Sequence, residues 1–222
     1  NYDEISVPWG PTEVSALSNK QGGTSVILDN GETWYTSDST FTGTWYNMSY
    51  GSSAPAFPVN YPAVQVHAST TMSTVLENGE AYWWTTSTPP VISLVELPQG
   101  SKAKSIFSSG GAGTNNGHIC VVLKDRNAVC AGDNDHGELG NGNTNDVWWG
   151  YELVFVYLPS GISSDIETMA LAKDSSCALF GNGSVYCWGN NEEGQLGDGT
   201  VCTYGGYENN CNGYGDKPII YE

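Results

Sequence analysis

The sequence predicts an all-β fold made of about four repeated units, each with about four short strands. Three observations support this class: a hairpin pattern recurs along the chain, glycine is frequent, and charged residues are few. Of the 222 residues, 28 are glycine, 12% are aromatic and 14% are charged. Thr, Ser, Val and Tyr are plentiful, as is typical of strands joined by turns. A chain of this length can bury a sizeable core, as one large domain or two small ones.

The recurring feature is a hairpin with a tight turn. Asn-Gly between two apolar runs is the strongest short hairpin signal, because both residues tolerate positive φ. The turn residues at equivalent positions are Gly31, Gly79, Arg126 and Gly183, so the repeat is 47 to 57 residues long. The apolar strands that precede the turns are 25–28, 73–76, 120–123 and 177–180. The strands that follow them contain 34–35, 82–84, 128–130 and 186–188, and three of these four are aromatic.

Two further apolar segments recur before each hairpin. The first is an extended run that ends in proline, with copies at 5–8, 55–58, 94–98 and 155–159. The second lies between that proline and the hairpin, with copies at 13–17, 63–67, 103–107 and 167–171. Four strands in 47 to 57 residues is the size of a propeller blade. The predicted units span roughly 1–54, 55–93, 94–153 and 154–222, within a single repeat domain, 1–222.

The six cysteines form three pairs that are close in sequence. None has the Cys-x2-Cys spacing of a structural zinc site. Two pairs flank equivalent hairpin turns, where a cross-strand bridge is geometrically reasonable. We expect three local disulfides and therefore an oxidising, extracellular compartment; reduced buried thiols are the alternative. The pairs are Cys120 with Cys130, Cys177 with Cys187, and Cys202 with Cys211.

Both cysteine hairpins of the repeat are followed by the pattern Gly-x4-Gly-x-Leu-Gly-x-Gly, at 132–142 and at 189–199. The segment 177–200 resembles the repeat of the regulator of chromosome condensation family, which also includes a secreted β-lactamase-inhibitory protein. The match is strong over 166–200 and moderate over 102–144, and it is weak over 1–101, where the loop pattern is absent. The resemblance implies β-propeller blades, usually seven to a closed ring.

Both ends of the chain fall inside a repeat unit. The run 216–222 looks like the opening of an apolar run, and 1–8 looks like the end of one. We therefore expect an open or incomplete ring in which 216–222 pairs with a neighbouring unit or subunit, because unpaired strand edges associate readily. An excerpt of a longer propeller and a compact four-bladed ring are the alternatives.

The charge balance restricts the choice of partners. Seven basic against 24 acidic residues give a net charge of −17, which disfavours binding to nucleic acid. No run of 18 apolar residues is present, so membrane insertion is not expected. The acidity is interpreted as a solubility feature, with divalent cation binding as the alternative.

No catalytic, cofactor or metal site is predicted. The stretch Asp133-Asn-Asp-His-Gly-Glu138 begins like a calcium loop, but it lacks Gly at the sixth position and Glu at the twelfth. A structural turn is therefore the favoured interpretation. His67, His118 and His136 lie far apart without the spacing of metal ligands. The chain is accordingly predicted not to be an enzyme and to need no cofactor.

Two sequons predict attached glycans. Asn47 begins Asn-Met-Ser and Asn182 begins Asn-Gly-Ser, each in a predicted turn or loop. Asn182 also suits the hairpin turn, so its alternative role is conformational. Aromatic residues late in the units are expected mostly to pack in the core, with a fraction available for a binding face. They are Trp34, Tyr35, Trp45, Tyr46, Trp83, Trp84, Trp148, Trp149 and Tyr151.

The predicted function is non-catalytic. We expect a secreted structural subunit of an extracellular filament or other assembly, which self-associates head-to-tail through its terminal strands. The alternative is an extracellular binding or inhibitory propeller module that recognises a partner protein. The resemblance also implies nucleotide exchange on a small GTPase, but that activity expects a reducing compartment and a seven-bladed ring, and neither fits this sequence.

Overall fold

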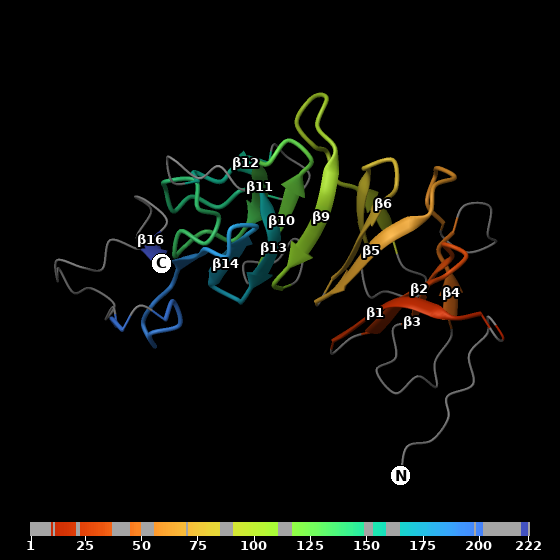
Figure 1. Ribbon diagram of the computed structural model, residues 1–222, viewed down its shortest axis with the longest axis horizontal. Helices are drawn as coiled ribbons and strands as arrows, with labels where there is room; N and C mark the ends of the chain where they lie inside the picture. Colours follow the sequence, from red (N-terminus) through yellow and green to blue (C-terminus); the bar gives the residue numbers. More distant parts are fainter. Residues whose placement is uncertain are drawn as a thin grey trace, which may run out of the picture. The chain divides into compact units, whose positions relative to one another are not determined.

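The computed structural model shows an all-β protein, as the sequence predicts. Its described residues form sixteen strands and no helix (Figure 1). No helix long and apolar enough to cross a membrane occurs among them. The described residues are 10, 12–20, 23–36, 45–49, 56–69, 71–84, 91–110, 117–148, 153–158, 165–197, 199–201 and 219–221.

The strands form four antiparallel sheets of four strands each, and every sheet uses strands that are consecutive in sequence. The first sheet contains β1 (Val14–Lys20), β2 (Gly23–Leu28), β3 (Thr33–Thr36) and β4 (Trp45–Asn47). The second contains β5 (Ala63–Ala68), β6 (Met72–Leu76), β7 (Ala81–Trp84) and β8 (Ile92–Leu94). The third contains β9 (Ala103–Ser108), β10 (His118–Leu123), β11 (Ala128–Gly132) and β12 (Val154–Phe155). The fourth contains β13 (Ile166–Leu171), β14 (Ser175–Phe180), β15 (Val185–Gly189) and β16 (Ile219–Tyr221).

The second and third strands of every sheet form the predicted hairpin, and the four turns share one geometry. Their turn residues have φ values of 83°, 83°, 80° and 88°, at Gly31, Gly79, Arg126 and Gly183. In each turn the preceding Asn or Asp side chain accepts a hydrogen bond from the backbone two residues later, at 2.9 to 3.2 Å. Turn chemistry that is local in sequence therefore defines each hairpin.

Two of the proline-ending runs differ from their predicted place. Instead of opening a unit, each begins at the last residue of the fourth strand of the preceding sheet, since β8 ends at Leu94 of the run 94–98 and β12 ends at Phe155 of 155–159. The run 55–58 lies beyond β4, and the run 5–8 lies outside the described residues.

The tail also differs from its predicted place. We expected 216–222 to pair with a neighbouring unit or subunit, but Ile219–Tyr221 pairs with β15 of its own sheet, with Ile219 opposite Cys187. The outer edge of β15 is the position that the fourth strand occupies in the other three sheets, and β16 satisfies its backbone hydrogen bonds.

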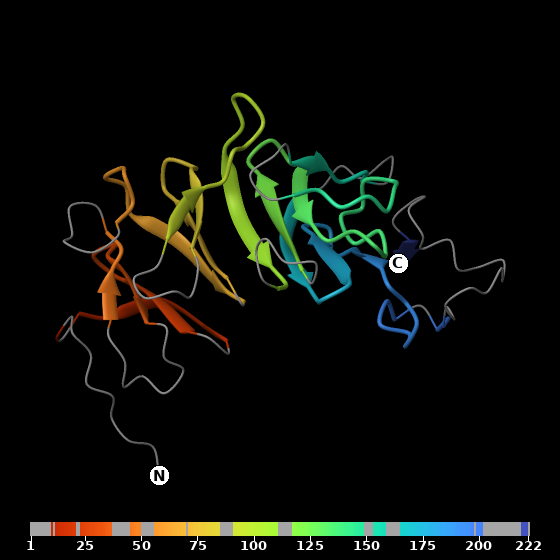
Figure 2. The same ribbon diagram turned by 180° about the vertical axis from the view of Figure 1, so that it is seen from behind.

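The chain divides into an N-terminal unit, Asn1–Val95, and a C-terminal unit, Glu96–Glu222. Each unit holds two sheets, and they pack in the same way in both. In the N-terminal unit β5 packs on β1 and β2, and in the C-terminal unit β13 packs on β9 and β10 (Figures 1 and 2). The first strand of the later sheet thus covers the first two strands of the earlier one.

Each unit has its own hydrophobic core. In the N-terminal unit Tyr35 and Trp84 are fully buried and meet edge to face, with ring centroids 6.1 Å apart. In the C-terminal unit Phe180 meets Tyr186 at 5.1 Å, and the core extends to Cys120 and Cys130. Aromatic residues therefore fill the space between sheets, where large rings bury most area.

Candidate functional site

Each of the two hairpins of the C-terminal unit is closed by its own disulfide. Cys120 is bonded to Cys130 across β10 and β11, and Cys177 to Cys187 across β14 and β15. The Cα atoms of the two pairs are 4.2 and 4.1 Å apart, because each pair lies directly opposite in the strand register. The pair Cys202 and Cys211 lies outside the described residues and stays a prediction.

The loops that follow these hairpins are organised by a buried asparagine. Asn134 Oδ1 accepts from the Leu139 backbone at 2.9 Å, and its Nδ2 donates to the Asn143 carbonyl at 2.9 Å. Asn191 makes the equivalent bond to Leu196, at 3.1 Å. Both leucines are buried. The asparagine at the equivalent position of both loops, which was not part of the predicted Gly-x4-Gly-x-Leu-Gly-x-Gly pattern, is therefore the structural basis of that pattern.

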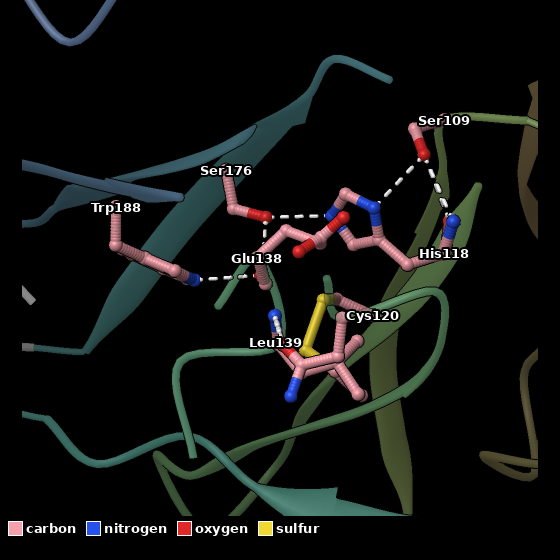
Figure 3. The surroundings of a disulfide bond; sticks show 9 residues. Ser109, His118, Cys120, Glu138, Leu139, Ser176 and Trp188 are labelled. Atoms are coloured by element: carbon pink, nitrogen blue, oxygen red, sulfur yellow. Dashed lines mark hydrogen bonds between the residues drawn. A yellow bond between two sulfur atoms is a disulfide. The ribbon is translucent and has the colours of Figure 1, made fainter. Parts of the chain in front are cut away.

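The first of these loops is fastened to the fourth sheet through the carbonyl of Glu138 (Figure 3). Ser176 Oγ on β14 and Trp188 Nε1 on β15 both donate to that carbonyl, each at 2.8 Å. His118 on β10 lies beside them, with Nε2 at 2.6 Å from Ser176 Oγ and Nδ1 at 3.0 Å from Ser109 Oγ. The network joins the third and fourth sheets.

The network determines the tautomer of the neutral His118 ring. Ser176 donates its one hydroxyl proton to the Glu138 carbonyl, so His118 Nε2 donates to Ser176, and Nδ1 of the neutral ring accepts from Ser109. Burial lowers the pKa of His118 to about 4. The imidazole is therefore neutral at physiological pH and acts as a connector within the core.

Three carboxyl groups gather next to this network. One oxygen each of Asp133, Glu138 and Asp174 lies within 4.8 Å of the others. Glu138 is 0% exposed; its Oε2 accepts from the His136 backbone at 2.8 Å, and its Oε1 has no hydrogen-bond partner among the described residues. Burial, reinforced by Asp133 and Asp174, raises the pKa of Glu138 to about 7. Burial also raises the pKa of Asp133. A second group that shares Asp133 includes the exposed Asp135 and Asp146.

A groove of about 1020 Å³ runs along β12 in the C-terminal unit. Three large aromatic side chains in its lining are exposed: Trp148 by 56%, Phe155 by 45% and Tyr157 by 63%. Both charged residues of the lining, Glu96 and Asp146, are acidic. The remaining lining residues are Leu97, Pro98, Asn141, Asn143, Val147, Leu153 and Val154.

The aromatic residues singled out in the sequence have both kinds of environment. Tyr35 and Trp84 are core residues, whereas Trp148 belongs to the groove. Trp149 and Tyr151 lie outside the described residues. Phe155 and Tyr157 were predicted only as members of an apolar run, and not as exposed groove residues. Their alternation with the buried Val156 was the available signal, because alternate side chains of an extended segment face opposite sides.

The two predicted glycosylation sites have different environments. Asn182 is exposed in the turn between β14 and β15, and its Oδ1 accepts from the Ser184 backbone at 3.1 Å. Asn47 is half-buried at the end of β4, and its Oδ1 accepts from the Ser49 backbone at 2.9 Å. Attachment of glycans to either residue stays a prediction.

Comparisons with known proteins support the blade interpretation. Residues 173–195 match the family model described as Regulator of chromosome condensation (RCC1) repeat. The X-linked retinitis pigmentosa GTPase regulator of Mus musculus is 32% identical over 80 residues, which are 36% of this chain and 8% of that protein. The chain therefore spans a small part of that relative's length.

Solved structures share the fold over most of the chain. Prp20p of Saccharomyces cerevisiae, described together with its binding to Gsp1p and histones, superposes with a TM-score of 0.62 at 18% identity, over 80% of this chain and 44% of that one. Human WBSCR16 superposes with a TM-score of 0.65 at 15% identity, over 97% of this chain and 55% of that one. At such identities the similarity shows the fold alone.

The four-stranded sheets and their loops define the chain as a β-propeller repeat protein. Residues 173–195 match the regulator of chromosome condensation (RCC1) repeat, and they overlap the segment 177–200, whose sequence resembles that repeat.

Proposed function

We propose that this chain is a protein-binding propeller module that recognises its partner through the groove along β12. The observation that carries the proposal is the exposure of Trp148, Phe155 and Tyr157 around one concave surface. Aromatic side chains dominate the energetics of protein interfaces, because they bury a large area with few rotatable bonds. Three of them in one groove are therefore suited to anchor a partner.

The charge of the groove defines the partner further. Glu96 and Asp146 are its charged lining residues, and the whole chain carries a net charge of −17. An apolar or aromatic segment flanked by Lys or Arg complements such a surface and is steered toward it. We therefore propose a basic, aromatic-containing protein segment as the ligand.

The same proposal includes an extracellular location and a non-catalytic role for the module. The disulfides of β10–β11 and β14–β15 are suited to an oxidising, extracellular compartment. Both ring nitrogens of the buried His118 are engaged by serine hydroxyls, so this histidine is not poised as a base for a substrate. A binding role accounts for the groove along β12 and its exposed aromatic side chains, whereas an enzymatic role gives them no part.

Assembly of the chain with itself is the competing use of the same groove. The head-to-tail fibre expected from the sequence required a free terminal strand, but β16 is engaged with β15. The exposed aromatic side chains beside β12 are instead the apolar surface that a second copy could cover. A structural role in an extracellular assembly would then depend on Trp148 and Tyr157.

A selection from a random peptide library on the purified chain tests the proposal. We expect enrichment of aromatic-containing sequences with Lys or Arg nearby. Trp148→Ala and Tyr157→Ala should weaken their binding at least about tenfold, since interface anchors contribute about 2 kcal/mol or more. Val185→Ala, which also trims an exposed side chain of this unit, is the matched control and should bind as the native chain does.

Two results would contradict the binding proposal. One is the absence of an enriched sequence class, and the other is equal affinity in the native chain and both aromatic variants. Sedimentation analysis over a range of concentrations separates the competing use. If the native chain self-associates and Tyr157→Ala is monomeric, the groove joins copies of the chain.

A further inference from the structure

We propose that Asp133, Glu138 and Asp174 bind a Ca²⁺ ion in the C-terminal unit. Asp133 directly follows β11, Glu138 lies in the loop after it, and Asp174 lies in the turn between β13 and β14. One oxygen of each lies within 4.8 Å of the others. Oxygen ligands at about 2.3–2.6 Å from a Ca²⁺ ion are separated from one another by up to twice that distance, so one ion can contact all three.

The carboxylate of Glu138 points to a ligand independently of the cluster. Its residue is 0% exposed, and Oε1 has no hydrogen-bond partner among the described residues. Oε2 is already engaged by the His136 backbone. A buried carboxylate oxygen without a partner destabilises the fold, and a bound cation removes that cost.

The described surroundings supply little positive charge to the cluster. Lys173 Nζ lies 3.3 Å from Asp174 Oδ1, but its side chain is 63% exposed, so its charge is well solvated. His118 is neutral at pH 7, since burial lowers its pKa to about 4. The raised pKa values of Asp133 and Glu138 reflect this deficit, because burial and like charges both disfavour ionisation. A bound divalent cation would favour the ionised form of both carboxyl groups and so lower their pKa values.

The chain contains its own comparison for this site. In the loop after β15, Asn190 and Gln195 occupy the positions that Asp133 and Glu138 occupy after β11. Gln195 Nε2 donates to Asn190 Oδ1 at 3.0 Å, so the amide pair satisfies itself. Two ionised carboxylates have no donor to offer. The acidic pair therefore needs either a proton or a bound cation, where the amide pair needs neither.

The number of protein carboxylates favours calcium over magnesium. Ca²⁺ accepts six to eight oxygen ligands in flexible geometry, whereas Mg²⁺ demands a near-ideal octahedron and is usually held by one or two carboxylates. The side chain of Asp174 is 24% exposed, so water can supply the remaining ligands. With three protein carboxylates we expect a dissociation constant of about 10⁻⁴–10⁻³ M, as in extracellular calcium modules.

Titration of the purified chain with Ca²⁺ after treatment with a chelator tests the proposal. Calorimetry at pH 7 should show one saturable site, and the melting temperature should rise with Ca²⁺ because the ion binds only the folded state. Tb³⁺ supplies a readout of location: Trp188, which donates to the Glu138 carbonyl, should sensitise its luminescence, and Ca²⁺ should displace it.

Paired variants test the ligands. Asp133→Asn combined with Glu138→Gln installs the amide pair of the loop after β15, so the fold should be retained while Ca²⁺ affinity falls at least about tenfold. Glu192→Gln combined with Glu193→Gln is the matched control. It also removes two negative charges, but from the loop after β15, and should leave the Ca²⁺ affinity within about twofold. The proposal is overturned if the native chain shows no Ca²⁺ response, if the first variant binds as tightly as the native chain, or if both variants weaken binding equally.

Discussion

Arg126 adopts a backbone conformation with positive φ, and glycine occupies the equivalent position in the other three hairpin turns. Its φ is 80°, and it is the one residue other than glycine with positive φ among those described. The left-handed region costs a residue with a Cβ about 1–2 kcal/mol. The side chain partly offsets this through Nε at 2.7 Å from Asp165 Oδ1, but both partners are at least half exposed, and such pairs contribute about 0–1 kcal/mol.

Arg126→Gly removes this strain but loses the surface pair and adds freedom to the unfolded chain. We therefore expect it to raise the free energy of unfolding by at most about 1 kcal/mol. Urea unfolding followed by tryptophan fluorescence measures the change. Arg126→Lys keeps the Cβ and should gain nothing. A gain of equal size in the lysine variant would show that the backbone conformation is not the cause.

His118 and Glu138 influence stability in opposite directions as pH changes. Burial lowers the pKa of His118 from 6.5 to about 4 and raises that of Glu138 from 4.5 to about 7. The unfolded chain takes up a proton at His118 that the folded chain does not, so this group destabilises the fold as pH falls from 6.5 to 4. The folded chain keeps a proton at Glu138 that the unfolded chain releases. That stabilisation is complete below 4.5 and is lost as pH rises through 7.

The two effects oppose each other between pH 4.5 and 6.5. We expect the unfolding free energy of the native chain, measured with a chelator present, to change little over this range. Glu138→Gln removes one of the two groups, so its stability should rise with pH by up to about 1.4 kcal/mol per unit. Glu193→Gln, an exposed control, should follow the native chain. Equal slopes in the native and Glu138→Gln proteins would show that Glu138 stays ionised in the fold.

At the scale of the element, the two disulfides lie within equivalent hairpins but in different surroundings. Cys120 and Cys130 are fully buried, whereas Cys187 is 8% exposed and Cys177 is half-buried. Each closes a loop of the same length, with a sequence separation of 10. Any chain-entropy contribution is therefore equal, and packing should decide the difference between them.

Replacement of either pair by alanine should lower the free energy of unfolding by about 2–4 kcal/mol. We expect the larger loss for Cys120→Ala with Cys130→Ala, because the deleted sulfur atoms leave a cavity within the core of the C-terminal unit. Thermal unfolding of both double variants measures the order. A larger loss at Cys177 and Cys187 would show that the hairpin of the fourth sheet depends on its cross-link more than on packing.

At the scale of the whole molecule, the two units repeat one packing scheme but differ in what they carry. All six cysteines, the segment 173–195 that matches the RCC1 repeat and the groove along β12 belong to the C-terminal unit. The N-terminal unit has the same hairpin turns and sheet packing. Its loops lack the Gly-x-Leu-Gly-x-Gly pattern. We therefore assign both proposed binding sites to the C-terminal unit.

The features that were predicted well are those that depend on residues close in sequence. The hairpins at Gly31, Gly79, Arg126 and Gly183 follow from turn chemistry over a few residues, and Cys120 and Cys177 face partners only ten positions away. The order of strands around each hairpin was harder to assign. A proline-ending run has no local signal that tells whether it closes one sheet or opens the next, because both edges offer the same backbone hydrogen bonds.

The candidate sites depended on distant residues to a greater degree. The sequence showed that 133–138 begins like a calcium loop, but the rest of the linear motif is absent. Asp174 completes a different set of ligands only because the turn between β13 and β14 lies against that loop. The missing partner of Glu138 Oε1 is likewise a property of burial, which depends on how the fourth sheet covers the third.

The sequence by itself determined the all-β class, the four hairpin units, the RCC1-repeat match of 173–195, and the pairing of Cys120 with Cys130 and of Cys177 with Cys187. These follow from φ preferences, strand alternation and proximity along the chain, all of which act over a few residues. Only the tertiary structure decided that β16 completes its own sheet, that Phe155 and Tyr157 face a groove, and that three carboxylates converge. Exposure, edge pairing and convergence depend on which surfaces pack together, and no short stretch of sequence specifies that.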